Sequence, residues 1–167
     1  IKVEPLDGDH TRIIGPYPYE KLAHVQSSTR YGGMENASSI FYADNIFRRR
    51  TMSEGLIAHE TAHQWFGDAV TTREWPHVWL SEGFATYFAA VWAERSRGDS
   101  AMLDEVRRMR ETVLKASVTV EKPVIDETLS DLRFVLNSNV YQKAGFVLHM
   151  LRHEVGDSAF YSAVRAF

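Results

Sequence analysis

The sequence contains no cysteine among its 167 residues. This absence excludes a disulfide framework and any cysteine-ligated metal site, so a bound metal would need histidine, aspartate or glutamate ligands. The longest uncharged run in the helical region, residues 83–93, is far shorter than the ~20 residues of a membrane-spanning helix. Basic residues form no long stripe: the net charge is −3, and the one dense cluster, residues 48–50, is expected to be a solvated face. We therefore expect neither a membrane nor a nucleic acid as a partner.

The length and composition are those of one globular domain. Hydrophobic residues make up 44% of the chain and charged residues 25%, which is ordinary for a protein with a buried core. The chain begins at Ile1 rather than at methionine and shows no leader segment, so we expect the true start to lie outside it. No signal in the sequence assigns a cellular compartment.

Turn-forming residues divide the first third of the chain into short segments, and helical patterns dominate the rest. Two β-prone runs, residues 23–28 and 39–43, predict a small sheet before residue 45. A helix is predicted from Thr51 to about Phe66, because Thr51 and Glu54 form a capping box and Gly67 follows. Further helices are predicted at 79–96, from a cap at Asp99 or Ser100 to about residue 114, at 137–155, and from a cap at Asp157 to the chain end, with an irregular segment at 118–136. Strands followed by helices indicate an α+β fold.

The segment LIAHETAHQWFGD, residues 56–68, carries a possible metal site. His59 and His63 lie four residues apart, so both imidazoles project from one face of the predicted helix. With Glu60 beside the first histidine this is the HExxH pattern, in which two histidines bind zinc and the glutamate acts as a base. Such a short pattern also arises by chance on an ordinary helix. A third ligand must therefore decide between the two interpretations.

Glu82 is the candidate for that third ligand. It lies in WLSEGFATY, residues 79–87, on the next predicted helix, and the intervening loop is long enough to fold this helix back beside the first. A glutamate at a helix start is often a surface residue that the helix dipole favours. The apolar residues around Glu82 indicate burial instead, and a buried carboxylate needs a partner. Two histidines, one carboxylate and a position for water form a known catalytic zinc set, so we predict one zinc ion per chain, held by His59, His63 and Glu82.

A second histidine pair, His149 and His153 in HMLRH, has the same spacing. Met150 stands where the catalytic glutamate would be, and no matching carboxylate follows, so we favour an ordinary amphipathic helix there. The three isolated histidines are expected to be packing or surface residues: His10, His24 and His77.

With these residues and YGGMEN at 31–36, the sequence resembles the catalytic domain of the M1 family of zinc aminopeptidases. The resemblance runs from about residue 16 through the last helix and covers GGMEN, HETAHQWFGD, WLSEGFATY and VYQKAGFVLHML in the family's order. Thermolysin-type endopeptidases share HExxH but lack GxMEN. The resemblance implies a thermolysin-like metallopeptidase catalytic domain, with a small N-terminal sheet followed by a mainly helical lobe, that hydrolyses the N-terminal bond of peptides with a free amino terminus.

The resemblance also implies roles for the residues of YGGMEN. Glu35 would bind the free α-amine of the substrate, because a carboxylate near the zinc pairs with an ammonium and fixes which bond is cut. Without the family, Glu35 would be interpreted as a turn residue. The backbone of Gly32, Gly33 and Met34 would contact the peptide, since glycine permits close approach. Tyr31 would line the pocket for the first side chain.

Tyr141 matches the family tyrosine whose hydroxyl stabilises the oxyanion, although its position at the start of an apolar helix also suits core packing. One departure from the family lies nearby. The family usually has glycine directly after the lysine of this motif, whereas Ala144 follows Lys143 here and glycine comes at position 145. The added methyl group could tilt the start of the helix and shift Tyr141.

The implied chemistry is peptide hydrolysis in which zinc activates water, Glu60 transfers the proton to the leaving amine, and Tyr141 shares the oxyanion charge with the metal. Family members are several times longer, so residues 1–167 are expected to form one partial catalytic domain that lacks its flanking domains. We expect it to bind zinc but to be weakly active alone. Two alternatives stay open: a non-catalytic scaffold of the family, and a bifunctional enzyme of the leukotriene hydrolase branch that also opens a lipid epoxide.

Overall fold

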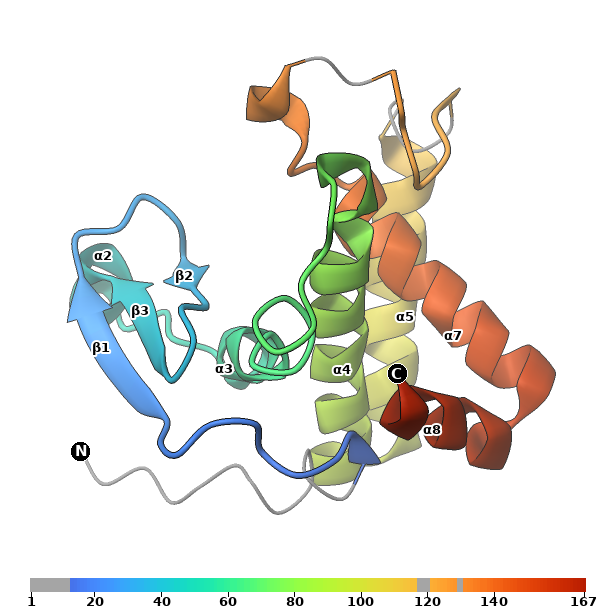
Figure 1. Ribbon diagram of the computed structural model, residues 1–167, viewed down its shortest axis with the longest axis horizontal. Coiled ribbons are helices and arrows are strands. Elements are labelled where there is room, and N and C mark those ends of the chain that lie inside the picture. The colour runs from blue at the N-terminus through green and yellow to red at the C-terminus, as the bar shows by residue number, and fades with distance from the viewer. Residues whose placement is uncertain (1–12, 117–120, 129–130) are drawn as a thin grey trace.

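The computed structural model describes residues 13–116, 121–128 and 131–167 (Figure 1). A small mixed sheet comes first and a lobe of packed helices follows, which confirms the predicted α+β order. The sheet order is β1-β3-β2. Strand β1 (Ala23–Ser27) runs parallel to β3 (Ser39–Ala43), with Ala23 opposite Ser39. Strand β2 (Gly33–Met34) pairs antiparallel with β3 and was not predicted.

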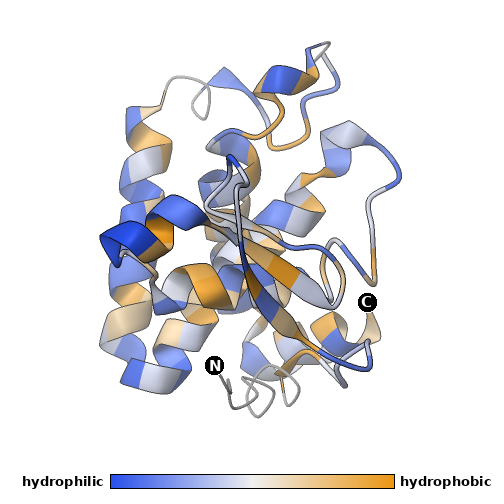
Figure 2. Cartoon of the chain, turned by 90° about the vertical axis from the view of Figure 1, so that its left-hand side faces the viewer, coloured by the Kyte–Doolittle hydropathy of each residue, from blue (hydrophilic) through white to orange (hydrophobic). Residues whose placement is uncertain are grey.

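A short helix, α2 (Asp44–Arg49), follows the sheet and was also not predicted. Arg48 lies 3.9 Å from Asp44 across one turn, and Arg50 ends the helix in the left-handed conformation. The arginine cluster is exposed, as expected for a solvated face. Seen from the side of the sheet, α2 ends in a strongly hydrophilic stretch (Figure 2).

Helix α3 (Glu54–Ala62) is shorter than predicted at both ends. Ser53, not Thr51, caps it, because the Ser53 side chain accepts a hydrogen bond from the Leu56 amide at 3.1 Å. Residues 63–65 are turns and Phe66 forms an isolated bridge with Val70, so the predicted end of the helix at about Phe66 is wrong.

Helix α4 (Trp79–Arg97) forms the centre of the lobe and packs against α3, α5 (Asp99–Lys115) and α7 (Ala144–Val155). Its sequence is apolar on most sides, and a helix of that kind is stable only when neighbours cover it. Phe66 packs against two α4 rings, with centroids 4.6 Å from Phe84 and 5.2 Å from Phe88. In Figure 1, α3 lies between the sheet and α4, which places the HExxH segment where the two parts of the fold meet.

The remaining elements agree with the predicted pattern except at one place. The 3-10 turns η1 (Trp75–His77) and η2 (Leu132–Phe134) lie in connecting segments, and α8 (Asp157–Ala166) is the last helix. The helix predicted at 137–155 is divided: a π-helical turn, η3 (Asn139–Lys143), precedes α7. No helix in the described ranges has both the length and the apolar character needed to cross a membrane.

Candidate metal centre

Helices α3 and α4 bring His59, His63 and Glu82 to one point. The Nε2 atoms of the two histidines lie 3.1 Å apart. Oε2 of Glu82 lies 3.4 Å from Nε2 of His59 and 3.2 Å from Nε2 of His63. A tetrahedral zinc ion with bonds of about 2.0–2.1 Å holds its donor atoms roughly 3.3–3.4 Å apart. The spacing of the three donor atoms therefore suits a single zinc ion.

Contacts at Nδ1 fix the orientation of the His63 ring. Its Nδ1 donates to the carbonyl oxygen of Phe66 at 3.0 Å and lies 3.1 Å from Oγ of Ser81, which donates to the same carbonyl at 3.2 Å. With Nδ1 occupied in this way, Nε2 faces the centre, as it does in histidines that bind metals. Gly67 allows this arrangement: its φ is +130°, and a Cβ there would lie 2.5 Å from the Ser81 oxygen.

The electrostatics of the centre favour a positive charge. Burial alone would raise the pKa of Glu82, but contact with the two imidazoles lowers it to about 2. Burial also opposes a charge on His63, yet contact with the Glu82 carboxylate raises its pKa to about 9. Oε2 of Glu82 is buried and receives no hydrogen bond from the described part of the chain. Two nitrogens and an otherwise unsatisfied carboxylate oxygen form a donor set that fits zinc.

Glu60 is buried beside this centre. Burial raises its pKa to about 7, and the nearby Glu35 and Glu82 carboxylates act in the same direction against His63. Strand β2 passes very close to it: a Cβ at Gly33 would lie 2.2 Å from both Cδ and Oε1 of Glu60. A carboxylate with a pKa near neutrality has the properties of a general base.

Glu35 directly follows β2, and its side chain lies near Glu60 and His63. One of its carboxylate oxygens lies within 4.8 Å of ligand atoms of Glu60 and His63. Its backbone carbonyl accepts a hydrogen bond from Gln64 Nε2 at 2.8 Å. Sequence reasoning missed Gln64, whose fully buried amide connects the HExxH segment to the loop that carries Glu35. Its position directly after a predicted ligand histidine was the only feature of the sequence that could have identified it.

A cavity of about 500 Å³ opens beside the centre. Its near wall includes Glu60, His59 and Tyr141, and its far wall is formed by residues of α4 and α5. Tyr31 and Gly32 lie on the rim, where the Tyr31 side chain is 57% exposed. Met34 is half-buried in β2 and does not line this cavity.

Tyr141 lies in η3, and its ring is nearly parallel to the imidazole of His59, with the centroids 6.0 Å apart. Burial and the neighbouring Glu82 carboxylate raise its pKa, so the hydroxyl stays protonated and can donate a hydrogen bond. Ala144 packs closely against α4. Its Cβ occupies space that Gly83 of α4 leaves open, because a Cβ at Gly83 would lie 2.4 Å away from it. Tyr141 thus lies beside the centre despite the departure from the family pattern.

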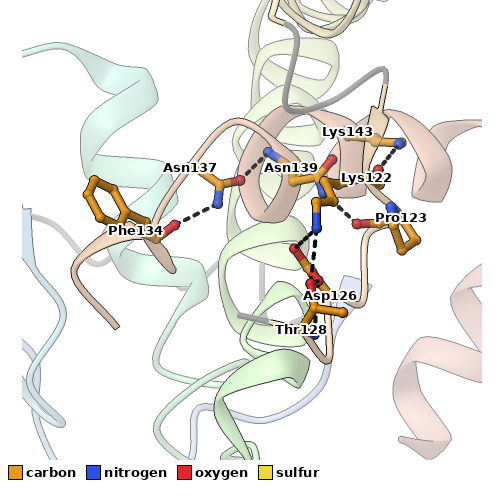
Figure 3. Close-up of polar contacts among 8 residues, drawn as sticks. All are labelled: Lys122, Pro123, Asp126, Thr128, Phe134, Asn137, Asn139 and Lys143. Atoms are coloured by element: carbon orange, nitrogen blue, oxygen red, sulfur yellow. Dashed lines mark hydrogen bonds and ion pairs between the residues drawn. The ribbon is translucent and has the colours of Figure 1, made fainter. Parts of the chain in front are cut away.

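A polar network holds η3 against the segment before it (Figure 3). Lys143 Nζ donates to the carbonyl of Lys122 at 2.6 Å, and Asn139 Nδ2 donates to the carbonyl of Pro123. The backbone N–H of Asn139 donates to Oδ1 of Asn137 at 2.8 Å. These contacts stabilise a π-helical turn, an irregularity that is frequent at functional sites. No sequence signal indicated it.

None of the other histidines in the described ranges joins the converging ligands. His149 packs near Tyr87, with ring centroids 6.1 Å apart, and His153 is exposed. Neither belongs to a group of metal-binding side chains in the described residues, where the two such groups both contain His63. His24 bonds through Nδ1 to the Tyr42 hydroxyl at 3.0 Å, whereas His77 lies in η1. The prediction for His10 falls outside the described residues.

Comparison with known proteins places this geometry in context. The model of the Peptidase family M1 domain matches residues 1–167. Aminopeptidase 2 of Candida albicans is 30% identical over 165 residues, covering 89% of this chain and 18% of the relative. Leucine aminopeptidase 2 of Ajellomyces capsulatus is 32% identical over 158 residues, covering 89% and 25%. The chain therefore spans about a fifth to a quarter of the length of these relatives.

Solved structures give the same fold. An M1 zinc metallopeptidase from Deinococcus radiodurans, an E323A mutant bound to a Tyr-Ser-Ala substrate, is 27% identical with a TM-score of 0.75, covering 99% of this chain and 37% of that one. Native leukotriene A4 hydrolase from Saccharomyces cerevisiae is 23% identical with a TM-score of 0.81, covering 93% and 26%. The second likeness concerns the fold alone.

Proposed function

The chain belongs to peptidase family M1, and on that premise we propose that it is the catalytic part of a zinc-dependent aminopeptidase. The observation that carries the proposal is the convergence of three groups: the donor atoms of His59, His63 and Glu82, the buried base Glu60, and the Glu35 carboxylate within 4.8 Å of that base's ligand atom. Relatives named as aminopeptidases, and a relative that binds a tripeptide, support a peptide substrate with a free amino terminus.

We also propose that residues 1–167 are one partial catalytic domain. The match covers only 18% and 25% of two curated relatives, which supports flanking domains that complete the substrate cleft.

In this proposal one zinc ion is held by His59, His63 and Glu82, and when bound it supplies Lewis acidity toward water and toward the scissile carbonyl. Glu60 accepts the proton that water loses as its oxygen bonds to the carbonyl carbon. The same carboxyl group then gives this proton to the amide nitrogen, so the leaving amine departs neutral as the carbon–nitrogen bond breaks. Burial raises the pKa of Glu60 above its ordinary value, which favours a carboxyl group that both accepts and returns the proton.

Glu35 and Tyr141 determine where this chemistry occurs. The Glu35 carboxylate binds the substrate ammonium, which places the first peptide bond over Glu60. The protonated Tyr141 hydroxyl donates to the oxygen of the former carbonyl as negative charge develops there. Gly32, Gly33 and Tyr31 border the path that the peptide takes into the cavity.

The test compares a free peptide with its N-acetylated form, each with and without a chelator. Chelator-sensitive cleavage of the free peptide alone supports an aminopeptidase. Cleavage of the acetylated peptide would identify an endopeptidase, and cleavage of neither would identify a scaffold. The lipid-epoxide alternative rests on a likeness of fold, and opening of an epoxide substrate in the same series would establish it as a second activity.

A further inference from the structure

We propose that Gln64 is a positioning residue for the amine anchor, which it holds at a fixed distance from the metal centre. The inference rests on the proposed function and deepens it, because it identifies what determines the position of Glu35. Gln64 directly follows His63 and is fully buried. A buried amide is stable only when its polar atoms are paired, so its partners reveal what it organises.

All of the hydrogen-bonding capacity of the Gln64 amide is used. Nε2 donates to the carbonyl of Glu35 and to the carboxylate of Asp68, both at 2.8 Å. Oε1 accepts from the amide of Ser38 at 2.7 Å and from the Tyr17 hydroxyl at 3.0 Å. Two acceptor partners on Nε2 and two donor partners on Oε1 therefore fix which end of the side chain is nitrogen and which is oxygen.

These contacts bracket the turn that carries Glu35. Gln64 binds the carbonyl of Glu35 and the amide of Ser38, so both ends of residues 35–38 are attached to one side chain on the ligand segment. Within the turn, the Ser39 amide bonds to the Asn36 carbonyl at 2.8 Å, and Ser38 has a φ of 63°. A non-glycine residue in this region is strained and persists only where surrounding contacts hold it.

The consequence is a short physical link between two parts of the centre. Glu35 follows strand β2 and His63 follows the last residue of α3, and they lie 28 positions apart in the chain. One side chain joins the backbone of the first to the residue after the second. A change at Gln64 should therefore alter how far the anchor lies from the scissile bond while leaving the metal ligands in place.

The experiment measures kcat and KM of the zinc-loaded protein on an aminoacyl p-nitroanilide for Gln64→Met, in the wild-type and in a Glu35→Ala background. Methionine fills similar space and removes every amide contact. If Gln64 acts through the anchor, KM rises about 10- to 100-fold in the wild-type background with a much smaller change in kcat. In the Glu35→Ala background the same substitution should change KM by less than about twofold.

The matched control is Thr61→Val, three residues earlier in the last turn of α3. Thr61 is buried, and its hydroxyl has no hydrogen-bond partner among the described residues, so valine should leave KM unchanged. Should Gln64→Met not fold, Tyr17→Phe replaces it. That variant removes the hydroxyl near Oε1 but keeps the ring against Trp65, where the centroids are 5.5 Å apart. A smaller rise in KM, again absent without Glu35, is expected.

Equal effects of Gln64→Met in both backgrounds, or a fall in kcat and zinc content with KM unchanged, would show a general structural role and overturn the inference. The proposed function would survive that result, because wild-type turnover would be intact. Absence of wild-type turnover on the free-amine substrate overturns the proposed function itself, and the inference with it.

Discussion

Replacing Gly33 by alanine should abolish most turnover while leaving zinc binding intact. The new Cβ would lie 2.2 Å from Cδ and Oε1 of Glu60, whereas carbon contacts are optimal at about 3.5–4.0 Å. The carboxylate must therefore move by more than about 1 Å, and a displacement of that size at a reacting group costs about 100-fold in rate. This corresponds to about 2.7 kcal/mol of transition-state stabilisation.

The fold should tolerate this substitution, because the atoms that must move are the end of a flexible side chain rather than backbone. Gly32→Ala is the matched control one residue away. A Cβ there would meet Ile46 Cδ1 at 3.7 Å and Leu56 Cδ1 at 3.9 Å, which are ordinary contacts. Neither glycine has a positive φ, so both positions accept alanine conformationally. We expect near-normal kcat in Gly32→Ala.

The assay is steady-state hydrolysis of an aminoacyl p-nitroanilide, with zinc content and thermal unfolding measured on the same samples. If the two variants have equal kcat, with zinc content and stability unchanged, then Gly33 does not protect the position of Glu60 and the reasoning is refuted. A rise in KM at constant kcat would instead indicate that β2 moves and displaces the amine anchor, which also contradicts the prediction.

Three further predictions follow from the same geometry. Glu60→Gln should retain one zinc ion per chain and lose about 10²- to 10⁴-fold in kcat, as a lost general base does; retained turnover would exclude the assignment. His59→Ala should lose the zinc that His153→Ala keeps, because of these two residues only His59 belongs to the group of converging donors. Atomic absorption after dialysis measures the zinc content of each variant, and a loss of zinc in both would contradict the site. Arg152→Met should lower the free energy of unfolding by about 2–3 kcal/mol, below the range for a fully buried pair because one of its partners is exposed. Arg152 is 9% exposed and lies 2.7 Å from Glu94, and urea unfolding with an unchanged midpoint would show that this pair adds nothing.

The architecture and most helices could be predicted from the sequence because they depend on local patterns. Helix α4 ends at Arg97 with Gly98 as its C-cap, as the glycine indicated. The predicted N-cap of α5 at Asp99 or Ser100 is wrong, because Gly98 is the N-cap and Asp99 is the first helical residue. The start of α3 was less certain, since Thr51 and Ser53 are both good caps and only the Leu56 amide selects between them. Helix α2 gave no signal, because six residues make fewer than two turns and owe their stability to tertiary packing.

The candidate ligands could also be named from the sequence, for two separate physical reasons. The four-residue spacing of His59 and His63 places them on one face of any helix. Glu82 followed from the apolar residues around it, because a buried carboxylate must be paired. The structure brings their donor atoms within 3.4 Å of one another. Their roles in catalysis, and those of Glu35 and Tyr141, stay predictions until the variants are measured.

The contacts between the HExxH segment and the residues around Glu35 could not be predicted from the sequence. We expected both Gly32 and Gly33 to allow a ligand to approach the backbone closely. In the structure, of these two only Gly33 leaves no room for a Cβ, and the group that it faces is Glu60. Gln64 contacts a turn 26 to 29 positions earlier in the chain, a distance that no local pattern spans. Residue types and spacing therefore predict which chemistry the centre has, whereas the distances between anchor, base and metal depend on tertiary contacts made by Gly33 and Gln64. Because those distances decide which peptide bond reaches the base, substitutions at these two positions should affect the reaction without altering any ligand.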